Sequence, residues 1–250
     1  MDKNFRKIAR PPHIINEQNQ YLLFYFMMKI SPYFTYFFHR YTNIKPNTLT
    51  FLSIFFLLVS FPLIIYKYYF LAFLLLFFNL LLDNIDGELA RVNNQSSKLG
   101  EFLERINSDI FYVFFYNFIC LSFYIENVLE LHYVILFIII SLAYFYIRQK
   151  ISHINIPDKF NINSSNEIFL GLFKYSNDIR NNNFKSKIIY LFFWNIIASG
   201  GVSEIILAIL ILSKNYELTI SYIFFYNIIV FIYMVTLLFI KIFLRFTYKS

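Results

Sequence analysis

Residues 68–82 read YYFLAFLLLFFNLLL, and the chain then continues as Asp83-Asn84-Ile85-Asp86-Gly87-Glu88-Leu89-Ala90-Arg91. The apolar part approaches the roughly 20 residues that a helix needs to cross the hydrocarbon core of a bilayer. Ionisable residues at the end of such a run are costly in a membrane and are functional candidates by default. This stretch therefore predicts a transmembrane helix that carries a polar site at one end.

The composition of the whole chain points the same way. Of 250 residues, 58% are hydrophobic and only 15% are charged, whereas a soluble globular domain usually carries about a quarter charged residues. Five glycines, six prolines and one cysteine exclude a collagen-like chain, a disordered chain and a disulfide scaffold. The sequence thus predicts an all-α polytopic membrane protein.

Six apolar stretches predict transmembrane helices, at 48–66, 68–90, 100–125, 132–148, 188–213 and 217–244. The earlier apolar segment from Tyr21 to Met28 is too short to span, and Pro32 follows it. We expect residues 21–40 to form an amphipathic helix at the interface, with a fold-back hairpin packed on other helices as the alternative. The chain then divides into a cytoplasmic N-terminus, 1–47, and a six-span membrane domain, 48–250.

The basic residues are distributed unevenly between the two sides of this arrangement. Nineteen lysines and arginines fall on the side of the termini and of the 91–99 and 148–187 loops, against only Lys67 and Lys214 on the other side. By the positive-inside rule, both termini and those loops are cytoplasmic. We therefore expect an integral membrane protein of the bacterial inner-membrane type whose polar site opens to the cytoplasm.

Acidic residues are concentrated in one window of the chain. Six of the fifteen carboxylates lie between residues 83 and 109, namely Asp83, Asp86, Glu88, Glu101, Glu104 and Asp109. They fall at the cytoplasmic end of the second span and in the first turns of the third. Since the four histidines lie elsewhere, this set suits a hard cation such as Mg²⁺ or Mn²⁺ better than zinc. Ion pairs at the membrane edge are the structural alternative.

The same window carries a motif with fixed spacing. Asp83, Asp86, Gly87, Ala90, Arg91 and Gly100 resemble the D-x-x-D-G-x-x-A-R, eight residues, G-x-x-x-D-x-x-x-D signature of the class I CDP-alcohol phosphatidyltransferases. Residues 46–50, PNTLT, are similar to a P-N-x-L-T segment of that family. The resemblance implies two Mg²⁺ or Mn²⁺ ions on Asp83, Asp86 and Glu104. It also implies that the donor nucleotide and diphosphate contact Asn47, Thr50, Gly87, Ala90, Arg91 and Gly100.

The chain departs from the family pattern at the last two aspartates. Glu104 takes the place of the third and keeps a carboxylate, but Ser108 takes the place of the fourth and cannot act as a general base. Glu101 lies one turn before Glu104 on the same helix face. We expect Glu101, through a water held by Ser108, to be the substitute base. Asp109 is the rival if the third span is over- or underwound.

The resemblance implies a membrane transferase of lipid synthesis that moves a phospho-alcohol group, typically phosphatidyl, from a CDP-linked donor to an acceptor hydroxyl and releases CMP. Its partners would be donor, acceptor and membrane lipids, with no nucleic acid. A non-catalytic family member that binds lipid or nucleotide, and a cation transporter, are the alternatives. The small residues of segment 199–204, SGGVSE, suggest close helix packing at a homodimer contact.

Overall fold

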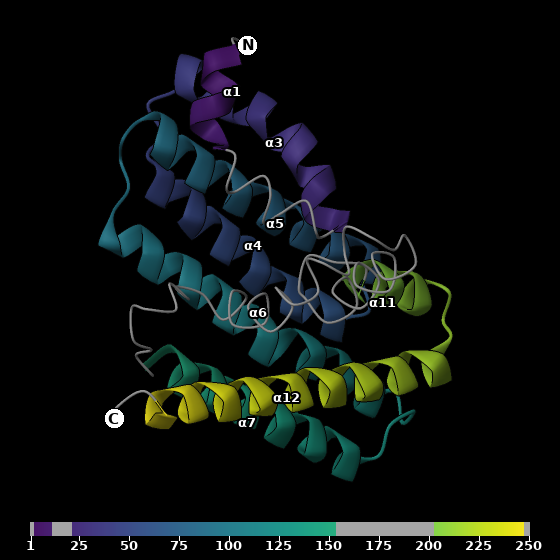
Figure 1. Ribbon diagram of the computed structural model, residues 1–250. Helices are drawn as coiled ribbons and strands as arrows, with labels where there is room; N and C mark the ends of the chain where they lie inside the picture. The colour runs from purple at the N-terminus through teal and green to yellow at the C-terminus, as the bar shows by residue number, and fades with distance from the viewer. Residues whose placement is uncertain (1–2, 12–21, 154–202, 248–250) are drawn as a thin grey trace, which may run out of the picture.

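The computed structural model describes residues 3–11, 22–153 and 203–247, and every regular element in these ranges is an α-helix. Figure 1 shows them as α1 (Lys3–Ala9), α3 (Leu22–Tyr41), α4 (Pro46–Ile65), α5 (Tyr69–Val92), α6 (Lys98–Ile125), α7 (Leu131–His153), α11 (Ser203–Leu212) and α12 (Tyr216–Thr247). Five helices of the described part, α4, α5, α6, α7 and α12, are long and apolar enough to cross a membrane. The prediction of an all-α integral membrane protein is confirmed to this extent.

The sixth expected span, at 188–213, is described only from Ser203 onward, where α11 begins. The segment 199–202, on which the expected dimer contact rests, lies outside the described residues. So does the basic 148–187 loop from residue 154 on. The number of six spans and the dimer contact therefore stay predictions.

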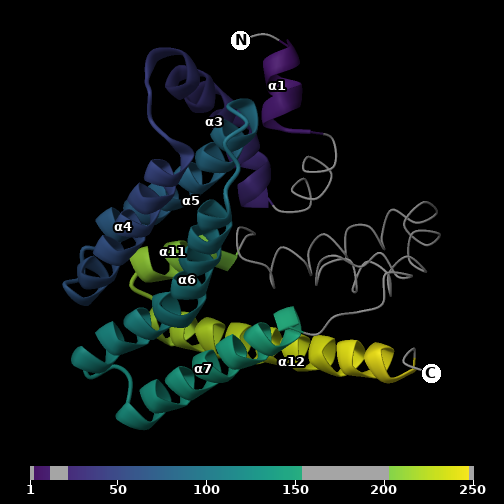
Figure 2. The same ribbon diagram turned by 90° about the vertical axis from the view of Figure 1, so that its left-hand side faces the viewer.

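Three helices form the part of the fold that carries the motif. α4, α5 and α6 lie side by side in both views, with α4 packed against α5 and α6 (Figures 1 and 2). α1 and α3 pack on another side of α5, while α7 and α12 pack together beside α6. The motif helix α5 is thus enclosed between the N-terminal helices and the rest of the bundle.

The helix α3 has two distinct faces. Met27, Ser31 and Thr35 are fully buried against the bundle, whereas Phe26, Tyr33 and Phe37 are about half exposed. Residues 22–41, where the amphipathic helix was expected, form a single helix that includes Pro32 and packs on α5. Its position at the membrane interface stays a prediction, although an exposed aromatic face suits that position.

Local sequence signals set the ends of the membrane helices. Pro46 stands in the first turn of α4, where its fixed φ suits a helix start. Ser97 caps α6 by accepting a hydrogen bond from the Gly100 amide at 3.0 Å. Lys67 and Asn94, which follow α4 and α5, have φ values of 66° and 52°. This left-handed conformation lets their neighbours bond to the last helical carbonyls and stops the helix.

Candidate active site

A pocket of about 150 Å³ opens where the N-terminus of α4 meets the ends of α5 and α6. Most of the residues that the motif predicts for the site line it together. The lining residues are Pro46, Asn47 and Thr50 from α4; Asp86, Gly87, Ala90 and Arg91 from α5; and Gly100, Glu101 and Glu104 from α6, with Gln95, Ser96 and Ser97 between. Asp83, which the motif also predicts, is not among them. Residues that are up to 58 positions apart in the chain thus face one hollow.

Carboxylates form one side of this pocket. Asp86 is 7% exposed, and the Thr50 hydroxyl of α4 interacts with it. The charges of Asp83 and Glu104 both act on Asp86, so the three groups lie within electrostatic range of one another. Concentrated negative charge of this kind attracts a cation and opposes an anionic ligand that arrives without one.

A small clasp joins the start of α6 to α4. The Ser97 hydroxyl, besides capping α6, donates to Asn47 Oδ1 at 3.3 Å. A Cβ at Gly100 would lie 3.1 Å from Asn47 Oδ1 and 3.3 Å from Ser97 Oγ, which is tighter than ordinary contact. The absence of a side chain at Gly100 therefore lets α6 approach Asn47 of α4 closely.

Gly87 likewise leaves room for a neighbouring group, the Arg91 side chain on the pocket wall. A Cβ at Gly87 would meet Arg91 Nη1 at 3.4 Å and Nη2 at 3.8 Å. The guanidinium therefore lies across the bare backbone of the preceding turn of α5. Its Nε points elsewhere and donates to the Ala9 carbonyl at 2.8 Å. The two Nη groups remain beside the pocket.

Asp83 is held by a residue that the motif does not contain. Asn107 of α6 donates to Asp83 Oδ1 at 3.0 Å and accepts from Asn79 Nδ2 at 2.9 Å. Asn79 also donates to the Ser53 carbonyl of α4 at 2.9 Å. This buried chain of hydrogen bonds joins all three helices directly beneath the carboxylates. Asn107 was not predicted as a site residue, although an asparagine inside an apolar span is a recognisable signal.

The remaining candidates on α6 are not gathered at the pocket. Ser108 lies one turn beyond Glu104 and is not among the pocket-lining residues of the described part. Asp109 is turned towards α7, where it is paired with Arg148 at 3.1 Å and accepts from Gln149 Nε2 at 3.0 Å. The structure therefore brings Glu101 to the pocket and takes Asp109 away from it.

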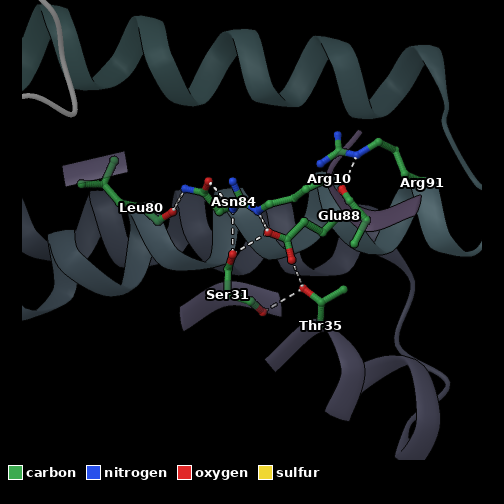
Figure 3. Close-up of polar contacts among 8 residues, drawn as sticks. Arg10, Ser31, Thr35, Leu80, Asn84, Glu88 and Arg91 are labelled. Atoms are coloured by element: carbon green, nitrogen blue, oxygen red, sulfur yellow. Dashed lines mark hydrogen bonds and ion pairs between the residues drawn. The ribbon is translucent and has the colours of Figure 1, made fainter. Parts of the chain in front are cut away.

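Glu88, one of the six clustered carboxylates, belongs to a different network, drawn in Figure 3. It is fully buried and bonds Arg10 Nε and Ser31 Oγ at 2.5 Å and Thr35 Oγ1 at 2.6 Å. Burial lowers the pKa of Arg10 from its ordinary value, and the Glu88 charge opposes that shift. Glu88 therefore forms a buried ion pair with Arg10 and is not part of the carboxylate group at the pocket.

The carboxylates near the pocket include oxygen atoms of the kind that bind a divalent cation. Within residues 3–11, 22–153 and 203–247, no three histidine, cysteine or acidic side chains are gathered closely enough to hold an ion. The chemistry nevertheless fits, because Asp86 Oδ2 is buried without a hydrogen-bond partner in the described part. Carboxylate oxygens are the ligands that Mg²⁺ and Mn²⁺ prefer. The residues present therefore suit a hard cation by type.

Comparison with known proteins bears on the motif. Residues 43–163 match the family of CDP-alcohol phosphatidyltransferases, over a little under half of the chain. No curated protein and no solved structure matches the sequence. The matched residues contain α4, α5 and α6 and the whole pocket described above. The resemblance seen in the motif is thereby confirmed as a match over residues 43–163, and this segment of the chain is similar to the CDP-alcohol phosphatidyltransferases.

Proposed function

We propose that this protein is a membrane transferase that passes a phospho-alcohol group, of which phosphatidyl is the first choice, from a CDP-linked donor to an acceptor hydroxyl and releases CMP. The observation that carries the proposal is the pocket itself. It unites most of the motif residues of α4, α5 and α6 and lies wholly within the segment that matches a family of such transferases.

The pocket supplies complementary groups for the donor. Asp86 and Glu104 of the pocket wall, with Asp83 within electrostatic range of both, would supply the carboxylates for Mg²⁺ or Mn²⁺ at the diphosphate, and the resemblance implies two ions. A bound divalent cation would offset the charge that builds up on the leaving CMP. Gly87 and Ala90 leave room for the nucleotide, and Arg91 adds a fixed positive charge. Asn47, Thr50 and Gly100 complete the wall.

The reaction needs a group that accepts one proton. The acceptor oxygen forms a bond to the phosphorus that bears the alcohol, the bond from that phosphorus to the CMP oxygen breaks, and the hydroxyl proton must leave. Glu101 is our candidate for the base because it lines the pocket beside Glu104. Asp109 is the weaker candidate because Arg148 and Gln149 engage it.

We further propose that the pocket opens to the cytoplasm. The side that carries the termini and the 91–99 and 148–187 loops has nineteen lysines and arginines, and the opposite side has two. Cysteines placed singly at the exposed positions Asn43 and Asn215, in a Cys120→Ala background, should react oppositely with an impermeant thiol reagent in intact cells. Labelling of position 43 from outside would reverse the proposed orientation.

The function is tested by CMP release from the purified protein. CDP-diacylglycerol and water-soluble CDP-alcohols would be offered with a panel of acceptors, namely glycerol phosphate, inositol phosphate, serine and a sugar alcohol. We expect release that depends on one acceptor and on Mg²⁺ or Mn²⁺. Donor binding without release under any pairing would favour the non-catalytic alternative, for which the serine at position 108 is the motivating observation.

A further inference from the structure

The motif helix α5 presents two functional faces, and only one of them faces the pocket. Asp86, Gly87, Ala90 and Arg91 line the pocket. Asn84 and Glu88, which occupy two of the four unspecified positions between Asp83 and Arg91, are buried on the side of α1 and α3 and bond Arg10 (Figure 3). The N-terminal segment is thus attached to the helix that carries the site, one turn away from the site residues.

The attachment is made by a charged pair in a dry environment. Arg10 is 6% exposed and Glu88 is fully buried. Arg10 Nε bonds Glu88, while Nη2 donates to Ser31 Oγ at 2.8 Å and to Asn84 Oδ1 at 3.2 Å. A buried pair of this kind adds little net stability over an apolar pair, but it fixes one geometry when its hydrogen bonds are satisfied. Fixed geometry is what a positioning element requires.

The residue before Arg10 connects this pair to the pocket. Ala9 is fully buried, and its carbonyl accepts the Arg91 Nε hydrogen bond at 2.8 Å. Only one peptide unit separates that carbonyl from the Arg10 side chain that is anchored on Glu88. With Nε committed, the planar guanidinium has a fixed direction, and its Nη groups lie over Gly87 at the pocket wall. An arginine held in this way can present its two Nη groups, with four N–H donors, to a phosphate.

We propose that Ala9 and Arg10 form a positioning element for the site: the buried Arg10–Glu88 pair fixes the Ala9 carbonyl, and that carbonyl aims the Arg91 guanidinium at the diphosphate of the donor. The inference rests on the proposed function, since it names the donor diphosphate as the group that Arg91 meets. Arg10 acts here through Arg91 and does not itself touch the substrate.

A double-mutant cycle separates positioning from mere support of the fold. Arg91→Lys keeps the positive charge but has no Nε–H for the Ala9 carbonyl. The dissociation constant for CDP-diacylglycerol would be measured with Mg²⁺ on the full chain in detergent. We expect Arg10→Met to weaken binding at least tenfold when Arg91 is present and less than twofold in the Arg91→Lys background. Equal losses in both backgrounds would overturn the proposal.

Two further variants guard against simple unfolding. Arg6→Met removes another contact between α1 and α3, the exposed bond from Arg6 to the Tyr33 hydroxyl at 3.0 Å, and should leave binding within twofold of the parent. Arg10→Met combined with Glu88→Leu removes both charges, so no unpaired carboxylate remains buried. This double variant should melt near the parent temperature and still bind the donor at least tenfold more weakly.

The results distinguish this inference from the function on which it rests. A parent protein that neither binds the donor nor releases CMP refutes the proposed function, and the positioning role with it. A parent that binds and turns over, together with full donor affinity in the Arg10→Met, Glu88→Leu variant, refutes the positioning role alone.

Discussion

A substitution at Asn107 best distinguishes a role in supporting the site from a role in supporting the fold. Replacing it by leucine keeps the side-chain size and removes two interhelical hydrogen bonds, to Asp83 at 3.0 Å and from Asn79 at 2.9 Å. Hydrogen bonds between membrane helices are worth about 0.6 kcal/mol each on average, and about 1.7 kcal/mol at most. The expected loss of stability for Asn107→Leu is therefore about 1–3 kcal/mol.

The expected effect of Asn107→Leu on metal binding is larger than its effect on stability. Asn107 holds Asp83 in place, and residues that orient a metal-binding carboxylate typically change metal affinity or activity by about 10–100-fold when they are replaced. We predict that Asn107→Leu raises the Mg²⁺ concentration needed for half-maximal CMP release by at least tenfold. Saturating Mg²⁺ should recover most of the turnover.

The assay is CMP release titrated with Mg²⁺, alongside thermal unfolding in detergent. Asn117→Leu is the matched control on the same helix, because the Asn117 amide bonds the Val113 carbonyl of its own helix. It should leave the Mg²⁺ titration unchanged. An Asn107→Leu protein with parental Mg²⁺ dependence would show that Asp83 needs no such support, and the reasoning would fail.

Two other predictions address the base and the pocket wall. Glu101→Gln should cut turnover at least tenfold with donor affinity unchanged, and Ser108→Asp should maintain or raise turnover. Asp109→Asn should instead lower the unfolding temperature, because it loosens α6 from α7. If CMP release falls in Asp109→Asn and not in Glu101→Gln, Asp109 is the base. Gly100→Ala should weaken donor binding more than Gly87→Ala. The new Cβ at position 100 would meet Asn47 at 3.1 Å and the capping Ser97, whereas at position 87 it would meet only the flexible end of Arg91 at 3.4 Å. Calorimetric titration with CDP-diacylglycerol compares the two variants, and equal affinities would contradict the contact between Ser97, Gly100 and Asn47.

The sequence predicted the helices of the central bundle because their signals are local. Each predicted span of this bundle is an apolar run of sufficient length, and that run overlaps the helix that it predicts. The ends were less accurate: α5 runs to Val92 and α7 to His153, beyond the apolar runs that predicted them. Hydropathy ends where the hydrocarbon ends, but a helix continues until a residue such as Asn94 turns left-handed.

The motif also predicted most of the pocket, since fixed spacing on two helices puts Asp86, Arg91 and Gly100 on facing sides. The supporting contacts could not be predicted in this way. Arg10 and Glu88 are 78 positions apart, and no periodicity relates them. The direction of Asp109 depends on how α7 packs against α6, which a local pattern does not contain. Contacts of this kind follow only from the assembled fold.

The central claim is that carboxylates of the pocket between α4, α5 and α6 bind a CDP-linked donor together with a divalent cation. Equilibrium binding of CDP-diacylglycerol to the parent protein and to Asp86→Asn, each with Mg²⁺ and with excess chelator, tests it most directly. We predict tight binding by the parent with Mg²⁺, and a loss of at least tenfold on chelation or in Asp86→Asn, with no further loss when both changes are combined. Equal affinity in all four conditions would contradict the claim.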